Sequence, residues 1–208
     1  SVFIGSTAGT AVTTGCCNVA IGSAALTANT TGTANVAVGN SSLLSNTTGC
    51  RNSSFGSQSL DANTEGDTNV AVGYQSLSAN TTADNNTAVG SFALLVNTTG
   101  CRSVAIGAES LKANTTGVNN VASGFQSMLL NTEGSKNSAY GYSSLGSNTT
   151  GNCNTAIGCG SLGGNTTAGE NTGVGYRALK GNTTGCQNAS FGTCSVYTNS
   201  TGDANTGV

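Results

Sequence analysis

The stretch Asn69–Asn85 reads NVAVGYQSLSANTTADN, and the same 17-residue pattern recurs along the whole chain. We number the positions of a unit as columns 1 to 17, with column 1 at Ser1 and then at every seventeenth residue. Column 1 is Asn in every later unit except at Ser103. Because 12 × 17 is 204, the 208 residues form twelve units and four residues of a thirteenth. No insertion or deletion breaks the phase, so each column is expected to form one ladder of like residues.

A unit of 17 residues is too short for a pair of helices and has the length of one coil of a β-solenoid. Columns 2 to 4 are rich in β-branched residues and predict a strand, and columns 8 to 11 predict a second, weaker one. Gly in column 5 and the Asn-Thr-Thr-Gly run of columns 12 to 15 predict corners with positive φ. We expect columns 2, 4 and 9 to face inward. The prediction is an all-β, uncapped parallel β-solenoid or β-roll, a single domain over 1–208, with about twelve coils roughly 4.8 Å apart.

Two columns predict stacks of identical side chains. Column 9 predicts a core Leu stack of Leu26, Leu43, Leu60, Leu77, Leu94, Leu111, Leu145, Leu162 and Leu179. Column 1 predicts a structural Asn ladder, whose amides hydrogen-bond from coil to coil. Its members are Asn18, Asn35, Asn52, Asn69, Asn86, Asn120, Asn137, Asn154, Asn171 and Asn188.

Column 12 begins an N-glycosylation sequon in most units. The candidate sites are Asn29, Asn46, Asn80, Asn97, Asn114, Asn148, Asn165, Asn182 and Asn199. Glycans there would coat one edge of the rod. The alternative is a second Asn ladder, in which the same amides pin the corner from coil to coil.

Eight Cys residues favour an oxidising setting, either extracellular or on the surface of a cell or virion. Those in column 16 lie at least two coils apart, about 9.6 Å, which exceeds the roughly 7 Å Cα separation that a disulfide spans. They therefore predict disulfides between chains, through Cys16, Cys50, Cys101 and Cys186. Free thiols at the corners, or a strained bond between the adjacent Cys16 and Cys17, are the alternatives.

The composition excludes several functional classes. Six Lys and Arg against eight Asp and Glu, a net charge of −2, cannot form a nucleic-acid-binding surface. Without any His the chain has neither a Ser/His or Cys/His catalytic pair nor an imidazole metal ligand. No apolar run approaches the 18 or so residues of a membrane helix. We expect no membrane insertion, catalytic residue, metal or cofactor, and we interpret Asp67 and Asp84, in successive units, as a solvated pair rather than a calcium site.

The repeat resembles two families. The segment Asn18–Gly22, Asn-Val-Ala-Ile-Gly, with Leu26 following, is similar to the head repeats of trimeric autotransporter adhesins, which form parallel β-rolls in a homotrimer. The segments that begin at Asn154 and Asn171, followed by Leu and Asn-Thr-Thr-Gly, look like the 17-residue repeats of phage tail-fibre-like proteins. The autotransporter repeat is shorter than this one. The resemblance implies an adhesin-like or tail-fibre-like, extracellular role.

These features predict a non-enzymatic structural fibre or shaft that acts as a rigid spacer for attachment. Its partners would be copies of itself, in a homotrimer or an end-to-end filament, together with surface glycans. The chain would then be either a segment of a longer fibre or a unit that stacks end to end. The alternatives are an ice-binding solenoid, which would use Thr columns such as those of Thr30 and Thr31, and a carbohydrate-binding one. In the latter, column-6 aromatic rings would stack on sugars: Tyr74, Phe125, Tyr142 and Tyr176.

Overall fold

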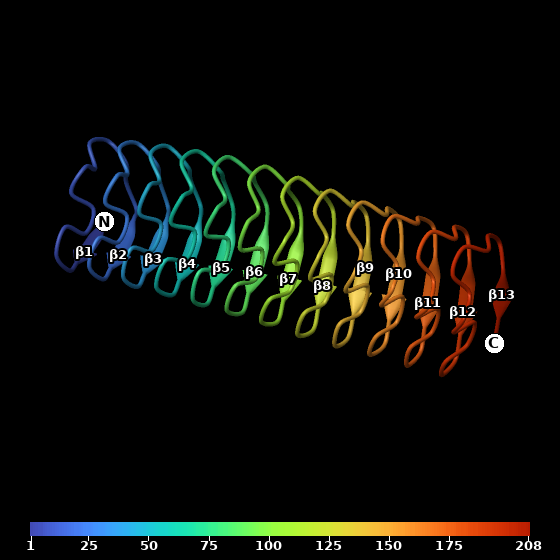
Figure 1. Cartoon of the computed structure of the whole chain (residues 1–208). Helices are drawn as coiled ribbons and strands as arrows, with labels where there is room; N and C mark the ends of the chain where they lie inside the picture. The colour runs from blue at the N-terminus through green and yellow to red at the C-terminus, as the bar shows by residue number, and fades with distance from the viewer.

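The computed structural model describes all 208 residues as one rod of stacked coils (Figure 1). Each coil contributes one strand, and the thirteen strands pair in parallel in chain order. The strands are β1 Val2–Ile4, β2 Val19–Ile21, β3 Val36–Val38, β4 Ser53–Phe55, β5 Val70–Val72, β6 Thr87–Val89, β7 Val104–Ile106, β8 Val121–Ser123, β9 Ser138–Tyr140, β10 Thr155–Ile157, β11 Thr172–Val174, β12 Ala189–Phe191 and β13 Thr206–Gly207. Paired residues are 17 apart, as in Val70 with Thr87. The predicted all-β, parallel β-solenoid of about twelve coils is confirmed.

The coil contains only one strand, so the prediction of a second strand over columns 8 to 11 is wrong. These columns form turns, because the residues in columns 7 and 9 are left-handed, as in Gln75 and Leu77, both at φ 52°. Backbone bonding from coil to coil nevertheless continues there, with Leu77 N donating to Ala93 O at 3.0 Å. A closed coil of 17 residues must bend within this segment, and left-handed residues two apart supply the bend.

The inner face of the strand carries column 3, and the expectation that columns 2 and 4 face inward is wrong. In β5 Ala71 is fully buried, whereas Val70 is half-buried and Val72 is 37% exposed. Column 9 does lie in the core, where its Leu side chains pack with the column-3 Ala side chains. The interior is so narrow that a methyl group is what fits beside a Leu. Side-chain size, and not hydrophobicity, therefore distinguishes the inner column from the outer two.

The first coil exchanges the sizes of these two positions. Phe3 stands in column 3 and Gly9 in column 9, where later coils have a small residue and Leu, Met or, at position 196, Val. A Cβ added to Gly9 would lie 2.6 Å from the Phe3 ring. The bulk that column 9 lacks is therefore supplied by column 3, a volume-conserving exchange of the kind that cores tolerate.

The corners differ in their use of glycine. Column 5 has the predicted positive φ, for example 132° at Gly73. Column 15 does not: Gly is favoured there because a Cβ would crowd the next coil, as at Gly100, where it would lie 2.4 Å from Gly117 O. Ala83 and Ala168 are the two exceptions in this column. The left-handed residue of this corner is in column 17, such as Lys136 at φ 59°. The prediction of positive φ in columns 12 to 15 is thus wrong.

Candidate functional site

The Asn side chains of column 12 form a hydrogen-bonded ladder inside the solenoid. Asn114 Nδ2 donates to Asn97 Oδ1 at 2.8 Å and to Gly117 O at 3.1 Å, and its Oδ1 accepts from Asn131 Nδ2 at 2.8 Å. From Asn29 to Asn182 the column is fully buried. A glycan would need the same Nδ2 atoms that make these bonds, so the ladder alternative, and not glycosylation, accounts for this geometry.

The column-1 Asn side chains form a parallel ladder beside it. Asn86 Nδ2 donates to Gly100 O at 2.9 Å, and the backbone N of Asn86 donates to Asn69 Oδ1 at 3.0 Å. Gly100 O also accepts from Asn97 Nδ2, at 2.8 Å, so the two ladders meet on one column-15 carbonyl. Ser103 replaces Asn with its hydroxyl, which accepts from Asn120 N at 3.3 Å. No buried side-chain nitrogen or oxygen lacks a hydrogen-bond partner.

Column 16 has a structural role that the sequence reasoning missed. Its side chain accepts a hydrogen bond from the column-16 backbone N–H of the preceding coil: Cys50 N donates to Asp67 Oδ1, and Asp67 N to Asp84 Oδ1, both at 2.7 Å. Cys186 N donates to Asp203 Oδ1 in the same way. The signal in the sequence is the predominance of acceptor side chains in this column. No group of three or more His, Cys, Asp or Glu side chains gathers anywhere in the chain.

All eight thiols are free, and six of them lie along the edge formed by columns 16 and 17. The Sγ atoms of Cys16 and Cys17 are 3.6 Å apart, and the hydrogen bond between the two thiols is the main reason why the pKa of the Cys16 thiol is raised. The Cys50 thiol donates to Thr48 O at 3.2 Å. Cys16 is exposed, and Cys50, Cys101 and Cys186 are partly exposed. Disulfides between chains at these four residues stay a prediction.

The outer face of the sheet is a mainly apolar stripe of columns 2 and 4, interrupted in column 4 by Ser123. Column 4 presents Ile21, Phe55, Val72, Val89, Ile106, Tyr140, Ile157 and Phe191, each between 36% and 46% exposed. Column 2 contributes mainly half-buried Val and Thr beside it. Neither column contains a charged residue in any coil.

The two Thr columns face solvent to different degrees. Thr115, in column 13, is half-buried, and its hydroxyl donates to Thr132 O at 3.1 Å. Column 14 points outward, but Glu65 and Glu133 interrupt it. Most column-13 hydroxyls repeat the Thr115 bond, so they serve the stack.

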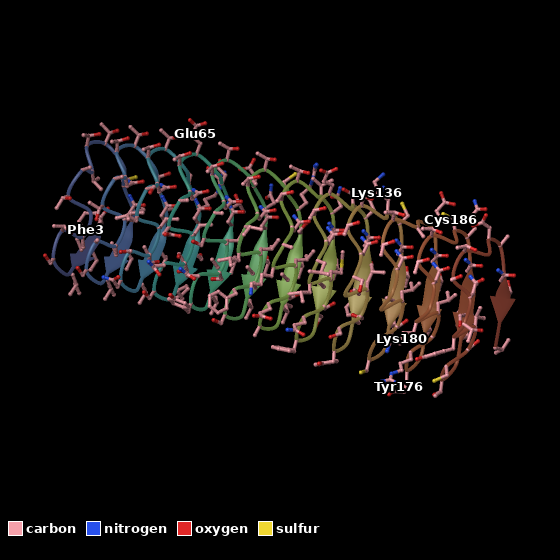
Figure 2. The ribbon with its side chains drawn as sticks, in the orientation of Figure 1. Phe3, Glu65, Lys136, Tyr176, Lys180 and Cys186 are labelled. Atoms are coloured by element: carbon pink, nitrogen blue, oxygen red, sulfur yellow. The ribbon has the colours of Figure 1, made fainter.

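The remaining surface, formed by columns 6, 7, 10 and 11, is irregular. Tyr74 packs edge-on against Phe92 with ring centroids 5.4 Å apart, and Phe125 stacks on Tyr142 at 5.8 Å. Arg177 lies over the ring of Tyr176, at 5.0 Å from its centroid. Figure 2 shows Tyr176 and Lys180 on the edge of the rod opposite Glu65, Lys136 and Cys186. Two hollows open on this surface, on either side of Leu129 and Leu130.

No protein-family model, curated protein or solved structure matches this chain. The structure also contains no helix with the length and apolar character needed to cross a membrane.

Proposed function

We propose that the chain is a segment of an extracellular, non-enzymatic structural fibre, in which it acts as a rigid shaft or spacer. The observation that carries the proposal is the unbroken register of the stack. Every coil from β1 to β13 pairs with the next in the same register, and both Asn ladders cross the coil boundaries (Figure 1). Twelve coils at about 4.8 Å give a rod of roughly 58 Å.

Rigidity follows from how each coil is held. Backbone hydrogen bonds join neighbouring coils at the strand, at the turn over columns 7 to 11 and at the Thr corner. Bending the rod at one coil would therefore break several bonds together. The resemblance of the repeat to phage tail-fibre-like and autotransporter head repeats supports the same role.

The apolar stripe of columns 2 and 4 supports copies of the chain as the partners. At about 58 Å long and roughly 10 Å wide, the stripe covers on the order of 600 Å², above the few hundred Å² of an ordinary apolar patch and near the roughly 800 Å² per partner of a stable interface. A second copy has the same 17-residue period, so side chains would meet in register along the whole rod. The absence of charge in the stripe removes the repulsion that would oppose a symmetric contact.

Sedimentation velocity tests the association. The chain is expected to sediment as an oligomer, well above its 20.2 kDa monomer mass. Replacing Val72 and Ile106 with Lys should give monomers, because both side chains lie in the stripe and charges are excluded from apolar interface cores.

The matched control is Thr99→Lys with Thr116→Lys, which adds the same charge to the outward Thr column and should leave the oligomer intact. Wild-type chains that sediment only as monomers would contradict the association. Electron microscopy tests whether the chain forms a rigid shaft, and straight rods are expected. Compact or strongly bent particles would overturn the proposed shaft function.

A further inference from the structure

One of the two hollows spans four coils between Leu130 and Lys180 and has the more positively charged lining. It has a volume of ≈ 290 Å³, and its walls are formed by coil eight (120–136) and coil eleven (171–187). Its floor lies in coils nine and ten, where Gly146 and Gly163 leave column 10 without a side chain. Two adjacent coils that lack bulk thus create a gap between walls about 14 Å apart, three coil spacings.

One wall carries two cations without a carboxylate partner. Arg177 and Lys180 both line the hollow and are half-buried, and neither belongs to the two ion pairs of the chain. No acidic residue lines the hollow, although the chain as a whole has a net charge of −2. Arg177 extends over Gly160, with its Cγ 3.5 Å from the place of an added Cβ. This concentration of unpaired positive charge favours an anionic ligand.

The rest of the lining is suited to a ring with an apolar face. Tyr142 is 55% exposed and its ring is held by stacking on Phe125. Leu130 on the opposite wall is 48% exposed. Gln126 Nε2 is occupied by Glu109, which leaves its Oε1 to accept from a hydroxyl group.

The second hollow provides a comparison within the same molecule. It is similar in volume, ≈ 360 Å³, and shares Leu129 and Leu130 as a wall. Its cation, Lys112, is already paired with Glu109 at 3.1 Å. The two hollows are therefore similar in volume and differ in available positive charge.

We propose that the hollow between Leu130 and Lys180 binds an acidic saccharide, with Arg177 and Lys180 on the carboxylate and Tyr142 against the sugar ring. A bidentate guanidinium contact fixes a carboxylate, and an aromatic face beside it accepts the C–H face of a pyranose. The site lies away from the apolar stripe, so it can fail while the shaft and its self-association stand.

Calorimetric titration with two probes tests the proposal. The probes are the tetrasaccharides of galacturonic acid and of hyaluronan. The control ligand is the methyl-esterified galacturonide, which keeps the sugar rings and replaces each carboxylate with a neutral methyl ester. At least one acidic probe is expected to bind, and the ester at least about tenfold more weakly. Arg177→Gln and Lys180→Ser should each weaken binding about tenfold. These variants place residues that their columns already accept elsewhere, as at Gln126 and Ser78.

A third variant separates shape from charge. Gly146→Leu fills the floor of the hollow with the residue found in the same column at Leu129, and should abolish binding while both cations remain. The control Lys136→Gln, on the opposite edge, should bind as the wild type does (Figure 2). The proposal is overturned if neither acidic probe binds or if the ester binds equally well. It is also overturned if binding survives Gly146→Leu, because binding would then depend on surface charge alone and not on the hollow.

Discussion

At the scale of single residues, the stack depends on amides that bond in both directions along the rod. Asn114 donates to the coil before it and accepts from the coil after it, in a fully buried position. Removing such a residue leaves partners in two coils without a hydrogen bond, and an unsatisfied buried polar group costs about 1–3 kcal/mol.

Asn114→Ala is accordingly expected to lower the free energy of unfolding by about 3 kcal/mol or more. It leaves Asn97 Oδ1 and Gly117 O without their donor and takes from Asn131 Nδ2 one of its two hydrogen bonds. Urea denaturation measures the change. The exposed neighbour Thr116→Ala is the control and should cost less than about 0.5 kcal/mol. Equal losses in the two variants would show that the ladder adds little to stability.

Column 15 offers the opposite change. At most of its Gly residues the N–H donates to the next coil, as Gly100 N does to Thr115 O at 3.3 Å, although Gly151 and Gly185 do not. Ala83 and its neighbour Thr82 both lack a backbone bond to the next coil. Ala83→Gly is expected to restore both bonds and to raise stability by about 1 kcal/mol, the two bonds being partly offset by the entropy of glycine. A lower urea midpoint for Ala83→Gly would contradict this explanation. The substitution Ala62→Gly, at a partly exposed residue whose φ is not positive, serves as a control for backbone entropy.

At the scale of the strand, the sequence predicts the element but not its orientation. The alternation of columns 2 to 4 indicates a strand of period two, and such a pattern has two possible inner faces. The apolar side chains of columns 2 and 4 favoured the wrong face, because the more hydrophobic face of a strand is usually the one that is buried. In this molecule a core one Leu wide admits only Ala71 and its equivalents, and the larger Val72 is left outside.

The turn over columns 7 to 11 was missed for a related reason. Left-handed φ at Leu or Gln is disfavoured by about 1–2 kcal/mol per residue, so local propensity argues against the observed turn. Bonding to identical coils on both sides outweighs that cost. The hollow beside Tyr142 was also missed. The sequence shows Gly146 and Gly163 in the same column, but not that this column lies on the outer surface between larger side chains.

The orientation of the strand can be tested with one pair of variants in β7. Ala105→Leu should destabilise the fold by about 1–3 kcal/mol or more, because the fully buried side chain has no room for added carbons. Ile106→Ser should cost the monomer less than about 1 kcal/mol, since the side chain is 45% exposed and column 4 already holds a Ser at position 123. Thermal melts of monomeric samples provide the measurement. If the serine variant proved the less stable of the two, column 4 and not column 3 would face inward.

At the scale of the whole molecule, cohesion comes from neutral groups. The chain has two ion pairs, and the side chains of Arg51 and Asp67 in one of them are 62% and 40% exposed. Exposed pairs of this kind contribute little and are screened by salt. The Leu stack and the amide ladders carry no charge, so salt does not screen them.

The melting temperature is therefore expected to shift by less than about 2 °C between low salt and about 0.5 M sodium chloride, with a similarly flat profile from about pH 5 to 8 because the chain has no His. On the acid side Glu109 contributes: hydrogen bonds from Gln126 and then Lys112 lower its pKa. A lowered pKa in the folded state means that its contribution is complete above the ordinary carboxyl range and is lost as the pH falls through the lowered value. Gln126→Leu should move the Glu109 pKa back toward its ordinary value, which a carbon-detected NMR titration would show, while leaving the melting temperature at pH 7 nearly unchanged. A melting temperature that rises steeply with salt would contradict this explanation. It would mean that hydrophobic contacts between copies, which salting out strengthens, stabilise the fold more than the neutral ladders within one rod.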